Sequence, residues 1–324
     1  MKVYFWGTRG SLPTSHAAHE IRDKVRAALL AARGRNLESD DDLDRFIDEL
    51  PFAVAGDYGG NTTCYEIQDD DLSQEYVLFD AGSGIHEFSK RYMAAGKEGE
   101  KAIFHIFISH VHWDHVQGFP FFAPAFIPGN RIVFHGHHAS LPDVLRYQME
   151  PPFFPIPIDA MEADLEFDIR PPGTAFSAAG FEISTIEQQH PGIAYGYRFE
   201  KNGKAIVFST DSEHQEGTSQ ENYPFVEFFK DADLVAFDAQ YSYAEACILK
   251  KDWGHSSNVV GVDLCQRARV KNLCMVHHDP EATDEWLDTF LKDSLTYRDI
   301  QNHDGPDRFP TKIYMASDSL CVEL

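Results

Sequence analysis

Four side chains that commonly bind metal ions occur close together in this sequence: His110, His112, Asp114 and His115, in the segment His-Val-His-Trp-Asp-His. They follow the apolar run 103–108, which is typical of a β-strand. Residues two apart in an extended segment point the same way, so His110 and His112 can bind one ion together. Asp114 and His115 follow where the chain turns, and they can serve a second ion. Imidazole and carboxylate are suitable ligands for Zn²⁺, Mn²⁺ or Fe.

Many short apolar and β-branched runs surround this segment, and helical patterns separate several of them. The arrangement predicts a mixed α/β chain with enough strands for two sheets. The expected strands are 3–6, 64–67, 76–79, 103–108, 132–135, 181–186, 205–209, 234–237 and 272–276. The expected helices are 85–95, 141–149, 258–268 and 284–295. No repeat or linker interrupts the pattern, so we expect a single domain over residues 1–324.

Residues 16–57 break the alternation of strands and helices. Two helix-like stretches, 21–32 and 43–50, flank a Gly-Arg-Asn turn and an acidic run. We interpret the segment as a helical insertion near the N-terminus. It could close over a cleft, join two subunits in a homodimer, or be a plain surface excursion.

The composition is that of a globular protein, since 43% of the 324 residues are hydrophobic. Five cysteines without CxxC spacing suggest reduced, mostly buried thiols. The first residues lack the pattern of a signal peptide, and no apolar run is long enough to cross a bilayer. These features predict a cytoplasmic protein with no membrane contact.

The formal net charge of -24 comes from 52 acidic and 28 basic side chains. A field of this sign repels the phosphate backbone of long nucleic acids, which makes such a partner unexpected. A small anionic substrate stays compatible with the charge, because bound metal cations can dominate the potential inside a cleft.

The His-Val-His-Trp-Asp-His segment resembles the HxHxDH signature of the metallo-β-lactamase-fold hydrolases. The resemblance implies a four-layer αββα sandwich and supplies later metal ligands, each after an expected strand. His190 lies in Gln-His-Pro, Asp211 in Ser-Thr-Asp-Ser, and His277 in Val-His-His-Asp-Pro, where position favours His277 over His278.

Further motifs are similar to those of the phosphodiesterase and tRNase Z-like branch of this family. Trp-Gly-His-Ser-Ser places His255 upstream of the last ligand, and Phe-Asp-Ala-Gln-Tyr places Asp238 in the branch's acidic position. Gly-Thr-Arg-Gly-Ser (7–11), Gly-Gly-Asn-Thr (59–62) and Asp-Ala-Gly-Ser-Gly (80–84) also fit. The chain departs from tRNase Z in lacking a long basic arm. It also keeps a histidine at position 112, where diiron oxidoreductases of this fold have glutamate.

The resemblance implies two divalent metal ions, Zn²⁺ or alternatively Mn or Fe, that activate a bridging hydroxide against a small, cyclic-nucleotide-like phosphodiester. One ion would be bound by His110, His112, His190 and Asp211, and the other by Asp114, His115, His277 and the shared Asp211. The candidate catalytic residues are Asp114, His255 and Asp238, with Asp238 orienting His255. Alternatives are a hydrolase of lactones, β-lactams or thioesters, an RNA-processing nuclease, and a metal-binding module without activity.

Other conspicuous residues are expected to have structural roles. His135, His137 and His138 follow a strand outside the matching motifs, so a metal role is not favoured. The Phe- and Pro-rich segments 118–126 and 151–157 should be rigid loops that serve as packing walls. If they line the cleft instead, a nucleobase or another flat group would suit them.

Overall fold

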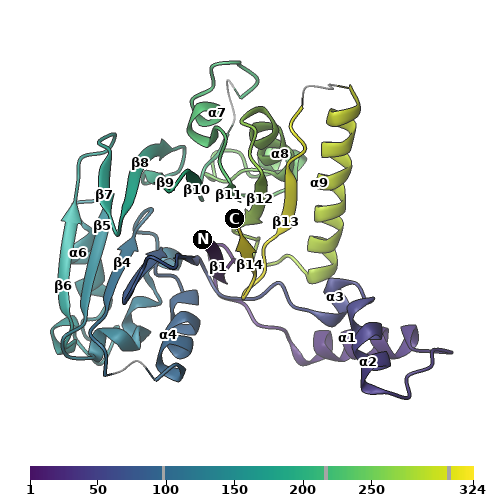
Figure 1. Ribbon diagram of the computed structural model, residues 1–324, viewed down its shortest axis with the longest axis horizontal. Coiled ribbons are helices and arrows are strands. Elements are labelled where there is room, and N and C mark those ends of the chain that lie inside the picture. Colours follow the sequence, from purple (N-terminus) through teal and green to yellow (C-terminus); the bar gives the residue numbers. More distant parts are fainter. Residues whose placement is uncertain (97–98, 215–217, 305–307) are drawn as a thin grey trace.

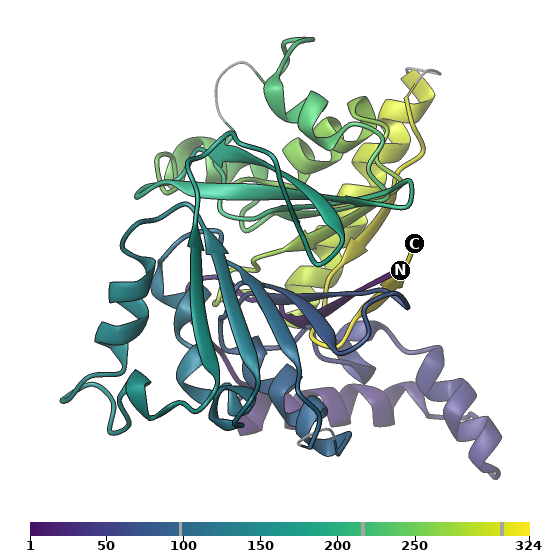
Figure 2. The ribbon, with the colours of Figure 1, turned by 60° about the vertical axis from the view of Figure 1, so that its left-hand side comes forward.

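Two seven-stranded β-sheets lie face to face at the centre of the molecule, with helices on their outer faces (Figures 1 and 2). The computed structural model describes residues 1–96, 99–214, 218–304 and 308–324. The first sheet has the order β14-β1-β2-β3-β4-β5-β6. Its strands are β1 (Lys2–Gly7), β2 (Cys64–Gln68), β3 (Glu75–Phe79), β4 (Ile103–Phe107), β5 (Arg131–Gly136), β6 (Asp164–Ile169) and β14 (Cys321–Glu323).

The second sheet has the order β13-β12-β11-β10-β9-β8-β7. Its strands are β7 (Phe176–Ala178), β8 (Phe181–Gln188), β9 (Ala194–Lys201), β10 (Lys204–Ser209), β11 (Leu234–Asp238), β12 (Asn272–Val276) and β13 (Lys312–Met315). Strands β10 to β13 are parallel to one another, as are β3 to β6 in the first sheet. The carboxyl ends of parallel neighbours meet at one edge of a sheet, which is where such folds place their sites.

Three apolar cores hold these layers together. One lies between the sheets, with Phe79, Tyr197 and Phe208 fully buried in it. The second packs α4 (Gly84–Ala94) and α6 (Leu141–Gln148) on the first sheet, and the third packs α7 (Pro224–Phe229), α8 (Asn258–Arg267) and α9 (Asp284–Asp304) on the second. The order helix, sheet, sheet, helix confirms the expected αββα sandwich.

Short helices fill the connections of the first sheet. They are α5 (Trp113–Val116), η1 (Phe119–Phe121), η2 (Ala123–Phe126) and η3 (Ile158–Ala160), and the second sheet adds η4 (Glu245–Leu249). The segment 118–126, expected as a loop, therefore consists largely of 3₁₀ turns. Proline near the first position of η1 and η2 favours such turns, because its fixed φ suits a helical start and it has no N–H to donate.

The nine expected strands are all present, but β6, β7, β9, β13 and β14 were not anticipated. In β9, Tyr195, Tyr197 and Phe199 alternate with Gly196, Arg198 and Glu200, so this strand contains no continuous apolar run. Helix α9 extends to Asp304, well past the expected end at 295.

Residues 16–57, the expected insertion, form three helices, α1 (Ala18–Ala31), α2 (Asp40–Asp48) and α3 (Phe52–Ala55), which extend to one side of the sandwich (Figure 1). Ser39 caps α2 by accepting a hydrogen bond from the Asp42 N–H. Helix α3 contacts both α1 and α9, and thereby connects the insertion to the second sheet's helical layer.

In the described part of the chain, no helix is long and apolar enough to span a membrane. All five cysteines are described and are free thiols. Cys64, Cys265 and Cys274 are buried, whereas Cys247 and Cys321 are exposed.

Candidate metal centre

The residues expected to bind metal ions lie just beyond the carboxyl ends of four strands. The His110–His115 segment follows β4, His190 follows β8, Asp211 follows β10, and His277 follows β12. Asp238 is the last residue of β11, between β10 and β12. Because β10, β11 and β12 are parallel, these ends meet at one edge of the second sheet, facing the end of β4 in the first.

Three histidines form one donor set. Donor atoms of His110, His112 and His190 all lie within 4.8 Å of one another. Nδ1 of His112 is 3.0 Å from Nε2 of His190, and the ring centroids of His110 and His190 are 4.9 Å apart. Such a spacing lets three imidazoles share one cation.

A second donor set adjoins the first and contains Asp114, His115, Asp211 and His277. Nε2 of His115 lies 3.2 Å from Oδ2 of Asp114, and Nε2 of His277 lies 3.3 Å from the same oxygen. All four residues are buried. The two carboxylates supply the negative charge that a buried divalent cation requires.

Asp211 stands between the two sets and presents a different oxygen to each. Its Oδ2 is 3.7 Å from Nε2 of His110 and 3.8 Å from Nε2 of His190. Its Oδ1 is 3.3 Å from Nε2 of both His115 and His277. One carboxylate can therefore contact two cations.

The donor atoms fit divalent metal ions in a further respect. His110 Nε2, His115 Nε2 and Asp211 Oδ1 are buried and have no hydrogen-bond partner among the described residues. Polar atoms buried without a partner are costly and usually mark an ion or a functional group at the site. All three point into the region shared by the two donor sets, so ions bound there would satisfy them.

The electrostatics differ between the two sets. Burial and the neighbouring His115 hold the pKa of His110 well below its usual value. Burial also lowers the pKa of His277, but Asp211 and Asp114 outweigh it and raise that pKa to about 9. The second set is thus arranged to hold positive charge, which a proton or a metal cation can supply.

Three residues at the site have left-handed backbone conformations. Asp80, Asp211 and His277 have φ values of 58°, 54° and 61°. Non-glycine residues adopt such angles at a cost, and they cluster at functional sites where the surrounding structure holds them. Each directly follows or closely follows a strand, so the strained turn aims a carboxylate or an imidazole at the centre.

Neighbouring groups fix the donors in place. Asp80 accepts hydrogen bonds from the Ser109 N–H at 2.8 Å and from Nδ1 of His115 at 2.7 Å. With Nδ1–H donating to Asp80, Nε2 of His115 is left as the metal-facing atom. The Ser11 N–H donates to Oδ2 of Asp114 at 2.8 Å, which gives the Gly-Thr-Arg-Gly-Ser motif a role.

His255 lies over the centre on a loop before α8. Its Nδ1 is 2.9 Å from Oδ2 of Asp238, and its ring stacks on His277 with centroids 4.9 Å apart. A donor atom of His255 is also within 4.8 Å of donors of His190 and Asp211. The structure therefore brings together every metal and catalytic residue expected from the sequence.

The choice between the two adjacent histidines follows from their directions. Nε2 of His277 faces Asp114 and Asp211, whereas Nε2 of His278 lies 2.7 Å from the Ala316 carbonyl. Burial lowers the pKa of His278 to about 3, so this residue is a neutral donor to the backbone.

Two supporting carboxylates were missed by sequence reasoning. Oδ2 of Asp318 accepts hydrogen bonds from the N–H groups of Gly60 and Asn61, and Oδ1 accepts from the Thr8 N–H. Glu213 accepts from the N–H groups of Asp252 and Gly254, and so holds the loop that carries His255. Asp318 is 310 residues from Thr8, and no local pattern could have revealed that pairing.

The other histidines singled out lie outside the centre. His135 is 3.0 Å from both His105 and Asp168, in a row of side chains across the first sheet. Nδ1 of His137 donates to the Arg170 carbonyl, and Nε2 of His138 donates to the Ile193 carbonyl.

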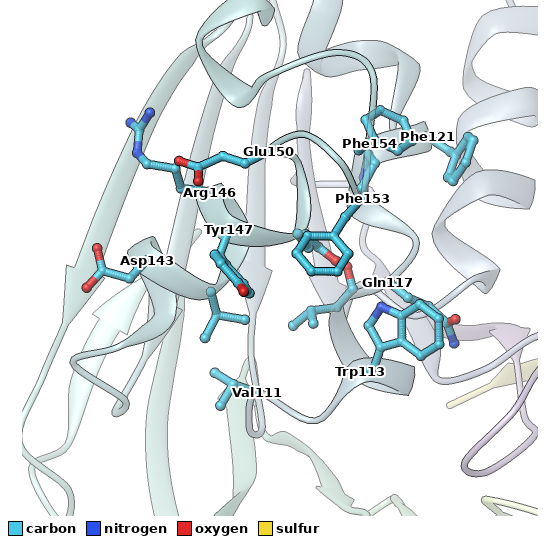
Figure 3. Close-up of a pocket in the computed structure, with 14 residues that line it drawn as sticks. Val111, Trp113, Gln117, Phe121, Asp143, Arg146, Tyr147, Glu150, Phe153 and Phe154 are labelled. Carbon is cyan, nitrogen blue, oxygen red and sulfur yellow. The ribbon is translucent and has the colours of Figure 1, made fainter.

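The aromatic loops divide between two roles. Phe119 and Phe122 are fully buried and serve as packing walls, as expected. Phe121, Phe153 and Phe154 instead line a pocket of about 1040 Å³ next to the metal-binding segment (Figure 3). These three side chains follow the alternative of loops that line a cavity, although Phe154 also packs against the core of the first sheet.

Comparison with known protein families identifies the family to which this chain belongs. Residues 75–278 match the beta-lactamase superfamily domain. Since this match spans more than half of the chain, the protein belongs to the beta-lactamase superfamily, and within it to the metallo-β-lactamase-fold hydrolases.

Curated relatives and solved structures agree with this assignment. Ribonuclease Z from Haloarcula marismortui is 23% identical over 72% of this chain and 87% of its own length. Ribonuclease Z from Staphylococcus haemolyticus is 23% identical over 78% of this chain and 94% of its own length.

Among solved structures, the metallo-beta-lactamase fold protein YhfI from Bacillus subtilis superposes with a TM-score of 0.64 at 16% identity, over 100% of this chain and 98% of its own. The short form of human tRNase Z gives 0.59 at 16% identity, over 100% and 99% of the two chains. The curated relatives are ribonucleases Z, in agreement with the resemblance to the tRNase Z-like branch. At these identities, the solved structures establish the fold.

Proposed function

We propose that this protein is a dinuclear, zinc-dependent phosphodiesterase that hydrolyses a small diester of the cyclic-nucleotide kind. The observation that carries the proposal is the position of Asp211, whose two oxygens face two separate donor sets. Two ions held there would stabilise the charge that develops on a phosphoryl group and supply the nucleophile at neutral pH.

The chain's own residues would bind the metal ions, orient the metal ligands and protonate the leaving group. The first ion would be bound by His110, His112 and His190 and the second by Asp114, His115 and His277, with Asp211 shared. Asp80 and Ser11 fix His115 and Asp114 by the hydrogen bonds described above, which keeps the donors in place without the substrate.

His255 is the proposed general acid. Its Nδ1–H donates to the fully buried Asp238, which leaves Nε2 for the centre. In the doubly protonated ring, the Nε2 proton would pass to the leaving oxygen and Nδ1–H would stay on Asp238. Asp238 also accepts a hydrogen bond from the Ser212 N–H, beside the bridging carboxylate. One buried carboxylate thus positions the proton donor and the turn that carries Asp211.

A side-by-side assay tests the reaction class. We expect zinc-loaded protein to hydrolyse bis-p-nitrophenyl phosphate, and to hydrolyse lactone, β-lactam and thioester substrates far more slowly. His112→Ala and Asp211→Ala should abolish diester hydrolysis. Equal turnover by these variants, or a preference for a carbonyl substrate, would overturn the proposal.

The curated relatives favour one other candidate, because they are ribonucleases Z. The net charge of -24 opposes an RNA substrate, since the phosphate backbone needs positive charge to bind. Incubation with a precursor tRNA decides between the two: cleavage with an efficiency above that for the small diester would favour the nuclease.

A further inference from the structure

A large aromatic pocket adjoins the metal centre. It encloses about 1040 Å³, and its walls include the rings of Trp113, Phe121, Tyr147, Phe153 and Phe154. The side chains of Trp113, Tyr147 and Phe153 are 66%, 63% and 64% exposed. Apolar surface that is left open to solvent in a concave site usually marks a place where a ligand binds.

The rings are arranged in pairs around the space (Figure 3). Phe153 packs against Tyr147 with centroids 5.3 Å apart, and Phe121 packs edge-on against Phe154 at 5.5 Å. Trp113 lies across the pocket from Tyr147 (Figure 3). Mutual packing keeps the rings in place, and so the pocket offers flat surfaces to a ligand.

The pocket and the metal centre share one segment of chain. Val111 and Trp113 line the pocket, whereas His110, His112 and Asp114 face the centre. His112 of the first donor set and Trp113 of the pocket are neighbours in the sequence, and both side chains are exposed. The rim of the pocket therefore adjoins the first donor set, and a substituent on a phosphate bound there would extend toward Trp113.

The polar groups of the pocket are mainly acceptors. The amide nitrogen of Gln117 donates to Oγ1 of Thr62, and that of Gln148 donates to the Val116 carbonyl, so both amide oxygens are left to accept. Asp143 and Glu150 add carboxylates. Arg146 also lines the pocket, but its guanidinium pairs with Asp159 at 2.9 Å. These groups favour a neutral ligand with N–H donors and disfavour an anion.

We propose that this pocket binds the heteroaromatic base of the substrate, so that the preferred diester is a nucleotide ester whose base carries an amino group. Flat walls suit a planar ring, and the acceptors suit its amino group. The inference rests on the proposed phosphodiesterase function and adds the part of the substrate that is recognised. Stacking of a base on aromatic side chains is worth about tenfold or more in affinity.

Two chromogenic diesters test the pocket in the metal-loaded protein. Adenosine 5′-(p-nitrophenyl phosphate) carries a base, and methyl p-nitrophenyl phosphate does not. We expect the first to have the higher kcat/KM. Phe153→Ala and Tyr147→Ala should lower the ratio of the two kcat/KM values about tenfold, by loss of stacking. Phe52→Ala, which changes a partly exposed phenylalanine outside the pocket, should leave the ratio unchanged.

A binding measurement separates the pocket from the chemistry. By calorimetry, AMP should bind the metal-loaded protein at least tenfold more tightly than ribose 5-phosphate, and Phe153→Ala should remove the difference. Equal binding of the two ligands, or an unchanged preference for AMP in Phe153→Ala, would contradict the proposal that the pocket binds the base. If neither diester is hydrolysed but AMP is still preferred, the result would contradict the proposed phosphodiesterase activity and support base binding in the pocket.

A second inference concerns the α1–α2 arm, which we define as residues 18–48. All 14 residues of α1 are described, and none is buried. Ile21, Val25 and Leu29, at a spacing of four residues, form one stripe and are 48%, 55% and 67% exposed. On α2, Leu43 and Ile47 are also exposed, at 41% and 48%. Such a stripe on a helix is typical of a face that packs against another helix.

The two helices of the arm differ in charge. Arg22, Arg26 and Arg33 are exposed on or just after α1, which also carries Glu20 and Asp23. Helix α2 carries Asp40, Asp41, Asp42, Asp44 and Asp48 against the single basic residue Arg45. We infer that the arm pairs with the arm of a second copy, with α1 of each copy against α2 of the other. Two-fold symmetry then places basic against acidic residues twice and covers both apolar stripes.

Sedimentation velocity tests whether the α1–α2 arm joins two copies of the chain. We expect a dimer that weakens at high salt, because ion pairs between exposed charges are screened. Val25→Glu combined with Leu29→Glu should raise the dissociation constant at least tenfold, with an unchanged circular dichroism spectrum, because two apolar side chains of the stripe are replaced by charged ones. Ile300→Glu, at an exposed position on α9, is the matched control. A monomeric wild type, or a doubly substituted variant that dimerises as well as the control, would contradict the pairing.

Discussion

Asp238 accepts a hydrogen bond from His255 at 2.9 Å while it is itself fully buried at the end of β11. This relationship fixes the imidazole beside the metal centre, where its ring stacks on His277 and a donor atom lies within 4.8 Å of donors of His190 and Asp211.

Substitution of His255 distinguishes between two possible roles of this residue, proton donor and metal ligand. We expect His255→Ala to lower kcat for the diester by about 10²-fold or more, while two metal ions per chain remain bound. Metal content by mass spectrometry accompanies the kinetics. Loss of one ion in this variant would instead make His255 a ligand, as its closeness to His190 and Asp211 allows.

Asp80 should affect metal affinity without contacting the ions. Without its hydrogen bond to Nδ1 of His115, that ring can change its tautomer and rotate away from the centre. We expect Asp80→Ala to weaken metal binding about 10–100-fold, measured by competition with a chelator. Asp168→Ala removes a carboxylate that pairs with His135 outside the centre and serves as the control. Equal effects of the two variants would show that only general destabilisation is measured.

Gly254 keeps space for His190. A Cβ atom at this residue would lie 2.3 Å from Nδ1 of His190, and the backbone has a φ of +85°. We expect Gly254→Ala to lower the metal content toward one ion per chain, because the first donor set is displaced. Gly203→Ala is a matched control, since φ there is +74° with nothing within 4 Å of the added atom. Two ions in Gly254→Ala would argue against His190 as a ligand.

His214 should make the fold sensitive to acid. Burial lowers its pKa to about 3, so the folded protein keeps it neutral while the unfolded chain takes up a proton below about pH 6.5. The unfolded state binds more protons in this window, and stability therefore falls as the pH falls from about 6.5 toward 3. Between pH 7 and pH 5, His214 should cost about 2 kcal/mol of the free energy of unfolding.

Urea unfolding of wild type and His214→Leu at both pH values measures this cost. The loss of stability on acidification should be smaller in the variant by about that amount. Equal losses in the two proteins would show that His214 is not kept neutral by the fold.

The sequence predicts those metal-centre residues that lie directly after a β-strand. His110, His190, Asp211 and His277 each follow a β-strand, and a strand pattern next to a ligand-type residue is visible in one short window. The left-handed turns at Asp211 and His277 were not predicted, because non-glycine residues adopt that conformation only where tertiary structure holds them.

Contacts between distant segments were beyond sequence reasoning. Asp318 connects the loops at Thr8 and Gly60, and the pocket brings Trp113 to Tyr147 and Phe153. Whether an aromatic side chain is buried, as Phe119 is, or lines a pocket, as Phe121 does, depends on the packing of neighbouring elements. Aromatic composition alone carries no such information.

Metal titration of the hydrolysis rate tests the central claim most directly. Protein freed of metal by a chelator receives zinc in small steps, and the initial rate on bis-p-nitrophenyl phosphate is measured at each step. Because Asp211 is shared by two donor sets, we expect little activity after the first equivalent and full activity at the second. Full activity at one equivalent, or no hydrolysis at two, would contradict a dinuclear phosphodiesterase.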